Sequence, residues 1–262
     1  MTTPELASVD GSISPTHEAT ISLPDDGLYR GDGVFEVIKL YGGRPFALEA
    51  HLDRLGQSAA AIGLEVDRAG FERELPALLE RFGSGDGALR MIVTRGGRRL
   101  LLTEPLPERL PEIRLATITY SPTVILNGVK SLSYGANMHA TRLARDAGGD
   151  EALLVRPDAV VLEAPTSAIF WVAGGELRTP ALECGILDSI TRRHLVADLG
   201  PAEGAFELAD LEGASEAFLA STTREVQPIA AIDGRDLAAS PGPVTSEAAD
   251  AFARVIAAEL GD

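Results

Sequence analysis

The sequence predicts a mixed α/β (α+β) protein built from two domains. The chain has 262 residues, 45% of them hydrophobic, which is enough for one large core or two of ordinary size. Helical apolar patterns alternate along it with runs rich in β-branched and aromatic residues. The proline of Tyr120-Ser-Pro-Thr123 interrupts a strand-rich run, and a new alternation of strands and helices follows it. We therefore expect an N-terminal α/β domain over 1–119, a linker over 120–124 and a C-terminal α/β domain over 125–262.

The N-terminal part is predicted to hold a strand over 18–23, which ends at a turn rich in Pro, Asp and Gly. The run from Tyr29 to Tyr41 predicts one strand of a hairpin that turns at Gly42-Gly43 and returns through 45–47. An apolar stripe predicts a helix over 48–63, and its spacing places His51, Arg54 and Ser58 together on a neighbouring face. The remaining elements expected here are a helix over 67–82 and strands over 88–95, 100–103 and 113–119.

The C-terminal part repeats this alternation. A helix is predicted over 136–147, and Asp188 or Ser189 is suited to cap another over 190–199. A final helix runs from Thr245 to Leu260, where apolar residues recur at helical spacing. The strands expected in this part cover 151–155, 160–162, 168–173, 216–221 and 225–231.

Composition excludes several classes of function. A net charge of −16 has the wrong sign for neutralising nucleic-acid phosphates, so no nucleic-acid partner is expected. The single cysteine, Cys184, allows no intramolecular disulfide and no thiolate-based metal site, and we expect no metal. No basic N-terminal region precedes an apolar run, and no window approaches about 18 apolar residues, so neither export nor membrane spanning is predicted. A reducing cytoplasm is the expected location.

A lysine placed before a predicted helix is the first candidate for chemistry. Only two of the 23 Lys and Arg residues are lysines, Lys39 and Lys130. Arginine does not lose its proton near neutral pH, whereas a buried lysine can act as an amine and attack a carbonyl. Lys130 is therefore a candidate Schiff-base lysine. The alternative is an exposed lysine at the start of a helix.

Three arginines gather in the glycine-rich loop Arg95-Gly-Gly-Arg-Arg99. One interpretation is a solvated hairpin tip. The other is a cationic gate for a substrate carboxylate, because an arginine fork matches a carboxylate with two parallel hydrogen bonds.

Three separate places offer groups suited to an anion. A helix that begins at Ser189-Ile190-Thr191 presents free backbone N–H groups, the Ser221-Thr222-Thr223 turn offers hydroxyls, and Arg54 offers a bidentate cation. A phosphate can use all three, although each is equally consistent with an ordinary cap, turn or surface cation.

Glu163 directly follows an apolar strand. It is either a carboxylate at a strand end that faces a cleft or an ordinary exposed carboxylate.

An ordered set of motifs resembles one protein family along residues 18–235. The segments are Gly31-Asp-Gly-Val-Phe-Glu36, His51-Leu-Asp-Arg54, Lys130-Ser-Leu-Ser-Tyr134, Glu151-Ala-Leu-Leu-Val155, Val161-Leu-Glu163 with Ser167, Gly185-Ile-Leu187, Ile190-Thr-Arg192 and Ser221-Thr-Thr223. In this order they resemble the class IV aminotransferases, the fold-type IV group of pyridoxal-phosphate enzymes. That group contains D-amino-acid and branched-chain aminotransferases, (R)-amine transaminases and aminodeoxychorismate lyases.

The resemblance implies two α/β domains with pyridoxal phosphate in the cleft between them, in a homodimer. Lys130 matches the lysine that forms the Schiff base and moves the substrate proton, and Glu163 matches the carboxylate that pairs with the pyridine nitrogen and keeps the ring an electron sink. Arg54, Ile190, Thr191 and Thr222 match phosphate contacts. The residues expected to bind the cofactor are Arg54, Lys130, Tyr134, Glu163, Ser167, Ile190, Thr191, Ser221 and Thr222. Those expected near the substrate are Tyr29, Val37, Arg98, Arg99 and Thr223.

The resemblance also implies the reaction, a transfer of an amino group between an amino acid and a 2-oxo acid. Val37 favours the D-amino-acid branch, because the lyases usually carry threonine there, whereas Ala168 departs from the asparagine of many relatives. Aminodeoxychorismate lyase and branched-chain aminotransferase are the alternatives within the family. A protein that binds the cofactor or another phosphate without turnover is the alternative of a different class.

Overall fold

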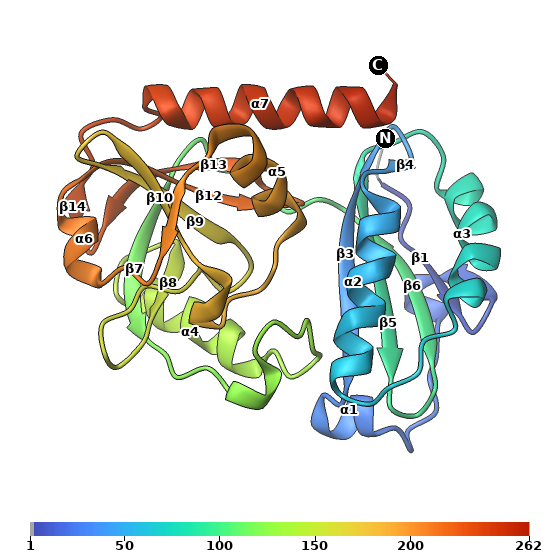
Figure 1. The fold of residues 1–262 in the computed structure, drawn as a ribbon. Coiled ribbons are helices and arrows are strands. Elements are labelled where there is room, and N and C mark those ends of the chain that lie inside the picture. The colour runs from blue at the N-terminus through green and yellow to red at the C-terminus, as the bar shows by residue number, and fades with distance from the viewer. Residues whose placement is uncertain (1–2, 262) are drawn as a thin grey trace. The chain divides into compact units, whose positions relative to one another are not determined.

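The computed structural model describes residues 3–261, and these fold into two compact units, each of mixed α and β structure (Figure 1). The first unit runs to Glu108 and includes Val129–Tyr134; the second comprises Arg109–Gly128 and the residues from Gly135 onward. The predicted mixed α/β class is confirmed. Among the described residues, no helix is both long and apolar enough to cross a membrane.

The first unit is built on an antiparallel sheet with the strand order β2-β1-β6-β5-β3-β4. Its centre is the long pairing of β3 with β5, from Gly33 opposite Thr94 to Leu40 opposite Gly87. The strands are β1 (Leu6–Val9), β2 (Ser12–Pro15), β3 (Gly33–Tyr41), β4 (Arg44–Pro45), β5 (Gly87–Thr94) and β6 (Arg99–Glu104).

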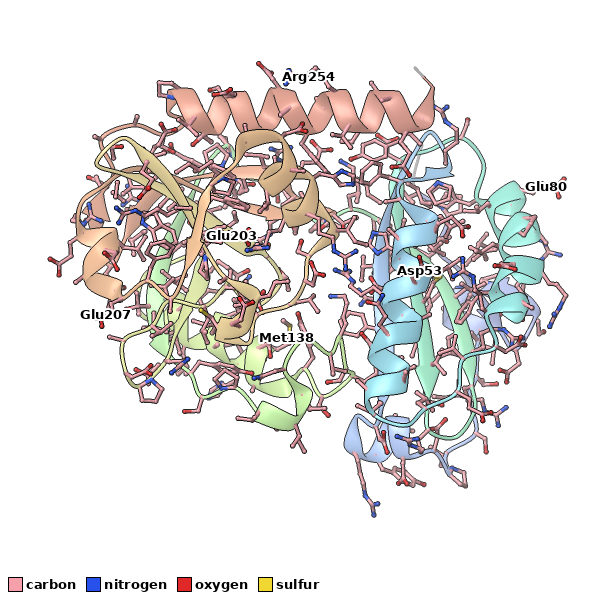
Figure 2. All side chains as sticks on the ribbon, in the orientation of Figure 1. Asp53, Glu80, Met138, Glu203, Glu207 and Arg254 are labelled. Carbon is pink, nitrogen blue, oxygen red and sulfur yellow. The ribbon has the colours of Figure 1, made fainter. Side chains whose placement is uncertain are left out.

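Two helices cover one face of this sheet, α2 (Leu48–Ala61) against β3 and α3 (Arg68–Phe82) against β1 and β6. The side chain of Asp67 caps α3 by accepting a hydrogen bond from the backbone N–H of Gly70 at 2.9 Å. Apolar stripes of both helices pack on the sheet, and Figure 2 shows Glu80 projecting from α3 away from it. The core is Val34, Ile38, Leu40, Leu52, Leu55, Ala59, Phe71, Leu75, Leu78, Phe82, Leu89, Met91, Val93 and Leu101.

Strand alternation divides the side chains of β3 between the two faces of the sheet. Val34, Ile38 and Leu40 belong to the core under the helices, so Glu36 points to the same side. Phe35 and Val37 point to the opposite face. Side chains on the same face of the sheet can therefore contact one another, whereas those on opposite faces cannot.

The second unit contains a sheet with the order β11-β10-β9-β12-β13-β7-β8, and β14 pairs with β13. The pairs β7–β8, β7–β13 and β10–β11 are parallel and the others are antiparallel. The strands are β7 (Ile113–Thr119), β8 (Glu151–Val155), β9 (Ala168–Ala173), β10 (Glu176–Pro180), β11 (Ala202–Gly204), β12 (Ala214–Ser221), β13 (Glu225–Ile232) and β14 (Arg235–Asp236).

Four helices complete the second unit: α4 (Gly135–Asp146), α5 (Ile190–Leu199), α6 (Leu208–Glu212) and α7 (Pro243–Leu260). Helix α4 packs on β7 and β8 through Ala140 and Ala144, while α5 packs on α7. On α7, Arg254 projects away from the strands (Figure 2). The main core of this unit contains Leu153, Ile169, Trp171 and Leu219, all fully buried.

Most predicted helices and strands are present, but three expectations are wrong. Residues 18–23 form no strand, because the N-terminal hairpin lies earlier, with Asp10 and Gly11 in left-handed backbone conformations between β1 and β2. The strand expected from Tyr29 starts at Gly33, because Asp25 caps a short helix, α1 (Asp26–Arg30). Residues 160–162 make only isolated bridges, to Val155 and Glu207.

The segment Val129–Tyr134 belongs to the first unit, whereas the sequence-based boundary assigned it to residues 125–262. Its backbone pairs with β3: Phe35 donates its N–H to the Lys130 carbonyl at 3.0 Å, and Leu132 donates to the Gly33 carbonyl at 2.8 Å. A Cβ at Gly33 would lie 2.6 Å from the Leu132 side chain and 2.5 Å from the Val93 carbonyl oxygen. Glycine at this position therefore allows the segment to lie directly on the sheet.

Candidate active site

The amine of Lys130 lies against an aromatic surface on the open face of the first sheet. Its Nζ is 4.5 Å from the centre of the Phe35 ring and 5.8 Å from that of Tyr134, and the two rings meet edge to face at 5.3 Å. The main chain is also held from the helix side, because the backbone N–H of Lys130 donates to Ser58 Oγ at 3.1 Å. The predicted pair Lys130 and Tyr134 is thus brought together, and Phe35 lies beside both.

A second cation on this face, Arg90, was missed by the sequence analysis. It lies opposite Val37 in the β3–β5 register, with its guanidinium carbon 5.7 Å from the centre of the Phe35 ring. Glu104 accepts from its Nε at 2.6 Å and from its Nη2 at 2.8 Å. The signal in the sequence is the alternation of β5, in which Leu89, Met91 and Val93 face the core and Arg90 faces the other way.

The arginines chosen from the sequence as a carboxylate gate lie elsewhere. Arg99 is on the helix-covered face, where its Nε donates to Glu74 at 2.8 Å and its Nη1 to Asp67 at 2.9 Å. Arg98 pairs with Asp10 at 2.9 Å. Both charges are therefore balanced by carboxylates of the first unit. Alternation along β6 turns Arg99 toward α3, on the other face of the sheet from Arg90. A contact of Arg98 or Arg99 with the substrate stays a prediction.

Arg54 belongs to a buried cluster with Glu36 and His51, whose side chains have 5%, 0% and 0% of their surfaces exposed. Glu36 accepts from Arg54 Nε and Nη2 at 2.7 Å each, and His51 Nδ1 lies 2.8 Å from the same carboxylate. Burial alone raises the pKa of Glu36, but the charge and hydrogen bonds of Arg54, with the hydrogen bond of His51, outweigh it and lower this pKa to about 2.

His51 is neutral in this cluster. Burial lowers its pKa, and the charges of Arg54 and Lys130 lower it further against the opposing effect of Glu36. Because the ionised Glu36 only accepts hydrogen bonds, Nδ1 of His51 carries the proton and donates it. The sequence placed His51, Arg54 and Ser58 on one face of α2, and all three are buried there.

In the second unit, Glu163 is held at the end of the extended residues that follow β8. Its backbone carbonyl accepts from Leu154 at 2.9 Å, and its side chain accepts from the backbone N–H of Leu187 at 3.1 Å. Burial and then the charge of Glu163 raise the pKa of Tyr120, whose hydroxyl donates to Asn137 at 3.4 Å. Glu163 is therefore a positioned carboxylate rather than a solvated one.

The start of α5 carries the features of an anion site. Ser189 caps the helix by accepting from the Arg192 N–H at 3.4 Å, which leaves other first-turn N–H groups to be satisfied. Ile190 and Thr191 are 2% and 0% exposed, and Thr191 Oγ1 is buried with no hydrogen-bond partner among residues 3–261. Ser167 Oγ is also buried and has no hydrogen-bond partner among these residues. A buried hydroxyl without a partner makes the folded state less stable, unless a ligand forms a hydrogen bond with it.

The Ser221–Thr223 turn joins β12 to β13 and is held by the residue after it. Arg224 donates its backbone N–H to Ser221 Oγ at 3.4 Å and its Nη2 to Glu151 at 2.6 Å. Glu151, which is 4% exposed, also accepts from Thr141 Oγ1 of α4 at 2.6 Å. This ties the turn carrying Thr222 and Thr223 to α4. The sequence analysis did not anticipate the network, because its members are far apart along the chain.

Tyr29 stands apart from these groups. It lies on α1 and is 61% exposed, whereas Val37 is half-buried on the face that carries Phe35 and Arg90. Within the described part of the chain, His, Cys, Asp and Glu side chains form no group of three or more that could hold a metal ion.

The Amino-transferase class IV family matches residues 33–232, which include parts of both units and all of the groups described above except Tyr29 and Asp10. This chain belongs to the class IV aminotransferase family. The resemblance drawn from its motifs is confirmed.

Similar class IV aminotransferases cover almost the whole chain. A Methanocaldococcus jannaschii protein assigned as a branched-chain-amino-acid aminotransferase is 35% identical over 254 residues, which cover 87% of this chain and 88% of its own. The D-alanine aminotransferase of Bacillus licheniformis is 31% identical over 274 residues, covering 95% and 96%. A hypothetical aminotransferase from Mycobacterium tuberculosis, solved in its PLP-bound form, has a TM-score of 0.87 at 26% identity, covering 97% and 99%.

Class IV aminotransferases use pyridoxal phosphate, and the groups of this chain fit that cofactor. The first unit supplies a positioned amine at Lys130 and a fixed guanidinium at Arg54. The second unit contains a hydrogen-bonded carboxylate at Glu163 and the start of α5, where the Thr191 hydroxyl has no hydrogen-bond partner among residues 3–261. An aldehyde, a pyridine nitrogen and a phosphate are the chemical counterparts of these groups.

The buried carboxylate predicts an acid-dependent stability. Glu36 is ionised in the folded chain down to pH about 2, whereas in the unfolded chain it titrates near 4.5, so between these values the folded chain binds fewer protons. Its contribution, about 3 kcal/mol, is complete above pH 4.5 and is lost as the pH falls toward 2. In Glu36→Gln, urea unfolding at a series of pH values should show a shallower fall in stability over this window. Glu80→Gln, an exposed control on α3, should follow the wild type; parallel curves for all three proteins would contradict the assignment.

The Thr191 hydroxyl has no hydrogen-bond partner among residues 3–261, so we expect it to contribute to the binding of a phosphate and not to the stability of the fold. Thr191→Val keeps the shape of the side chain and removes only the hydroxyl, so without ligand its melting temperature should equal or slightly exceed that of the wild type. Added pyridoxal phosphate should raise it less than it raises the wild type, as followed by differential scanning fluorimetry. Thr191→Ser, which keeps the hydroxyl, is the control. A ligand-free Thr191→Val protein that melts well below wild type would show that the hydroxyl has a structural role instead.

Proposed function

We propose that this class IV aminotransferase moves an amino group between a D-amino acid and a 2-oxo acid, with Lys130 as the amine that binds pyridoxal phosphate. The observation that carries the proposal is the position of Lys130. Its backbone is hydrogen-bonded to both β3 and α2, and its Nζ lies over the Phe35 ring on the open face of the sheet. The other lysine, Lys39, lies over Tyr41 within β3.

The remaining roles follow from the chemistry of each group. Bound pyridoxal phosphate supplies an electron sink for the charge left when the substrate α-carbon loses its proton. Lys130 Nζ is the base that removes this proton, and Glu163 keeps the pyridine nitrogen protonated by placing a negative charge beside it. Arg54, Ser167, Ile190, Thr191, Ser221 and Thr222 hold the phosphate end, and Tyr134 packs beside the amine. Tyr29 and Thr223 remain candidates for contact with substrate.

The preference for D-amino acids is supported by Val37 and by the similarity to the D-alanine aminotransferase. Val37 adds an apolar wall to the face that carries Phe35 and Arg90, and it lacks the hydroxyl that a lyase-type threonine offers a substrate. Arg98 and Arg99 remain candidates for the substrate carboxylate, and Arg90 is a further candidate because it lies on this face near Phe35. The Glu104 carboxylate, which Arg90 now holds, shows the geometry of such a contact.

We also propose that the chain acts in the cytoplasm as a homodimer. Val124 and Ile125 are 78% and 84% exposed, and large apolar side chains so exposed are suited to an interface with a second copy. A monomer mass from light scattering would contradict the dimer. The cytoplasmic location rests on the single cysteine, which is typical of a chain from a reducing compartment.

Replacement of Lys130 tests the covalent attachment directly. In Lys130→Ala, turnover should fall by at least about four orders of magnitude, because the amine is both the attachment point and the base. Borohydride reduction followed by peptide mass spectrometry should place the cofactor on Lys130 in the wild type and nowhere in the variant. Lys39→Ala is the matched control and should retain attachment and activity. A reduced adduct on Lys39 would overturn the assignment.

A panel of amino donors tests the substrate class. D-alanine and D-glutamate should convert the bound cofactor faster than their L-enantiomers, as followed by the absorbance of the cofactor in single turnovers. Aminodeoxychorismate should release little pyruvate. Arg90→Ala should raise the KM for amino acids more than for (R)-amines, which lack the carboxylate. Faster reaction with L-leucine or L-valine than with any D-amino acid would assign the chain to the branched-chain group and leave the role of Lys130 unchanged.

A further inference from the structure

Glu36 and His51 have no role in the chemistry proposed for this family member, yet they are fully buried beside a residue that has one. Both oxygens of Glu36 are used: Oε1 accepts from Arg54 Nε at 2.7 Å, and Oε2 accepts from Arg54 Nη2 at 2.7 Å and from His51 Nδ1 at 2.8 Å. The carboxylate comes from β3, and its two partners come from positions three apart on α2. One residue of the sheet therefore orients two side chains of the helix.

The two parallel hydrogen bonds fix the plane of the Arg54 guanidinium. A guanidinium has five N–H donors in a rigid fork, and Glu36 takes the Nε–H and one Nη2–H. Of the other three N–H donors, one on Nη2 and one on Nη1 form the end edge of the guanidinium, here called its outer edge. Because the contact with Glu36 fixes the plane of the group, the outer edge has a single orientation, which suits two oxygens of a phosphate.

His51 strengthens this arrangement without adding charge. It is neutral and donates through Nδ1, so the cluster contains one negative and one positive group, Glu36 and Arg54. The positive charge of Lys130, in the segment that pairs with β3, also lowers the pKa of His51. Because the charge of Glu36 offsets that of Arg54, the attraction of Arg54 for a phosphate at long range is weak. Its contribution must come from directed hydrogen bonds, which depend on orientation.

From this geometry we infer that Glu36 and His51 are positioning residues: they hold Arg54 so that its outer edge binds the 5′-phosphate of the cofactor, and they thereby make the chain select pyridoxal phosphate over pyridoxal. The inference rests on the phosphate role of Arg54 in the proposed function. A cluster that only joined α2 to β3 would stabilise the fold and would affect both forms of the cofactor equally.

The experiment measures the affinity of the full chain, freed of cofactor, for pyridoxal phosphate and for pyridoxal. Binding is followed by the absorbance of the cofactor in the wild type, Arg54→Ala, Glu36→Gln and the double variant. Loss of a charge-assisted contact should reduce affinity for pyridoxal phosphate in Arg54→Ala by about 10- to 100-fold, with pyridoxal changed less than about twofold. Glu36→Gln should reduce it by about 10-fold in the same selective way. In the double variant, Glu36→Gln should add nothing to Arg54→Ala, because it acts through that residue.

A second pair of variants tests His51 independently of any loss of folding in Glu36→Gln. His51→Asn keeps an N–H donor near the position of Nδ1 and should retain the selectivity for the phosphorylated form. His51→Leu removes the donor and should lower that selectivity.

Each contrary outcome has a distinct meaning. If Arg54→Ala leaves the ratio of the two affinities unchanged, the phosphate role of Arg54 in the proposed function is wrong. If Arg54→Ala lowers the ratio but Glu36→Gln and His51→Leu lower both affinities equally, the cluster is structural and the inference is overturned. A Glu36→Gln protein that binds pyridoxal phosphate more tightly would overturn it as well, because charge rather than orientation would then govern the site.

Discussion

The backbone pairing of residues 130–132 with β3 is the constraint on which the position of the Lys130 amine depends. Two main-chain hydrogen bonds, to Lys130 and from Leu132, extend the sheet by a short segment that is distant in sequence. Ser58 of α2 holds the same segment from another side. Main-chain hydrogen bonds of this kind leave a side chain only its own torsions to vary, so the Lys130 amine is confined to the region of the Phe35 and Tyr134 rings.

Each unit contains a buried glutamate whose charge is balanced by an arginine. Glu36 pairs with Arg54 in the first unit, and Glu151 pairs with Arg224 in the second. An isolated buried carboxylate would cost several kcal/mol, whereas a planar guanidinium repays much of that cost through aligned hydrogen bonds. The chain has only two lysines in 262 residues and uses arginine for this purpose. Because lysines are so few, Lys130 could be selected from the sequence as a candidate amine.

The arginines show the limit of local patterns. Arg90 and Arg99 lie on β5 and β6, the two strands that a glycine-rich turn joins, and the sequence analysis considered only Arg99 as a contact to a carboxylate. The side that each faces depends on the pleat of its strand and on the register of that strand with its neighbour. A single residue of register exchanges the two faces. Arg99 therefore lies among Phe71, Glu74 and Asp67, while Arg90 lies near Phe35.

The sequence by itself determined the family and most of the helices, because periodic apolar stripes, caps and ordered motifs are local properties. The face of α2 that carries His51, Arg54 and Ser58 followed from its spacing alone. Only the tertiary structure decided which groups these side chains meet. Glu36 and Arg54 are 18 positions apart and Ser58 and Lys130 are 72 apart, and no local pattern specifies partners at such separations. The packing of α2 on the sheet selects them, because burial requires each charge and each backbone donor to find a partner within reach.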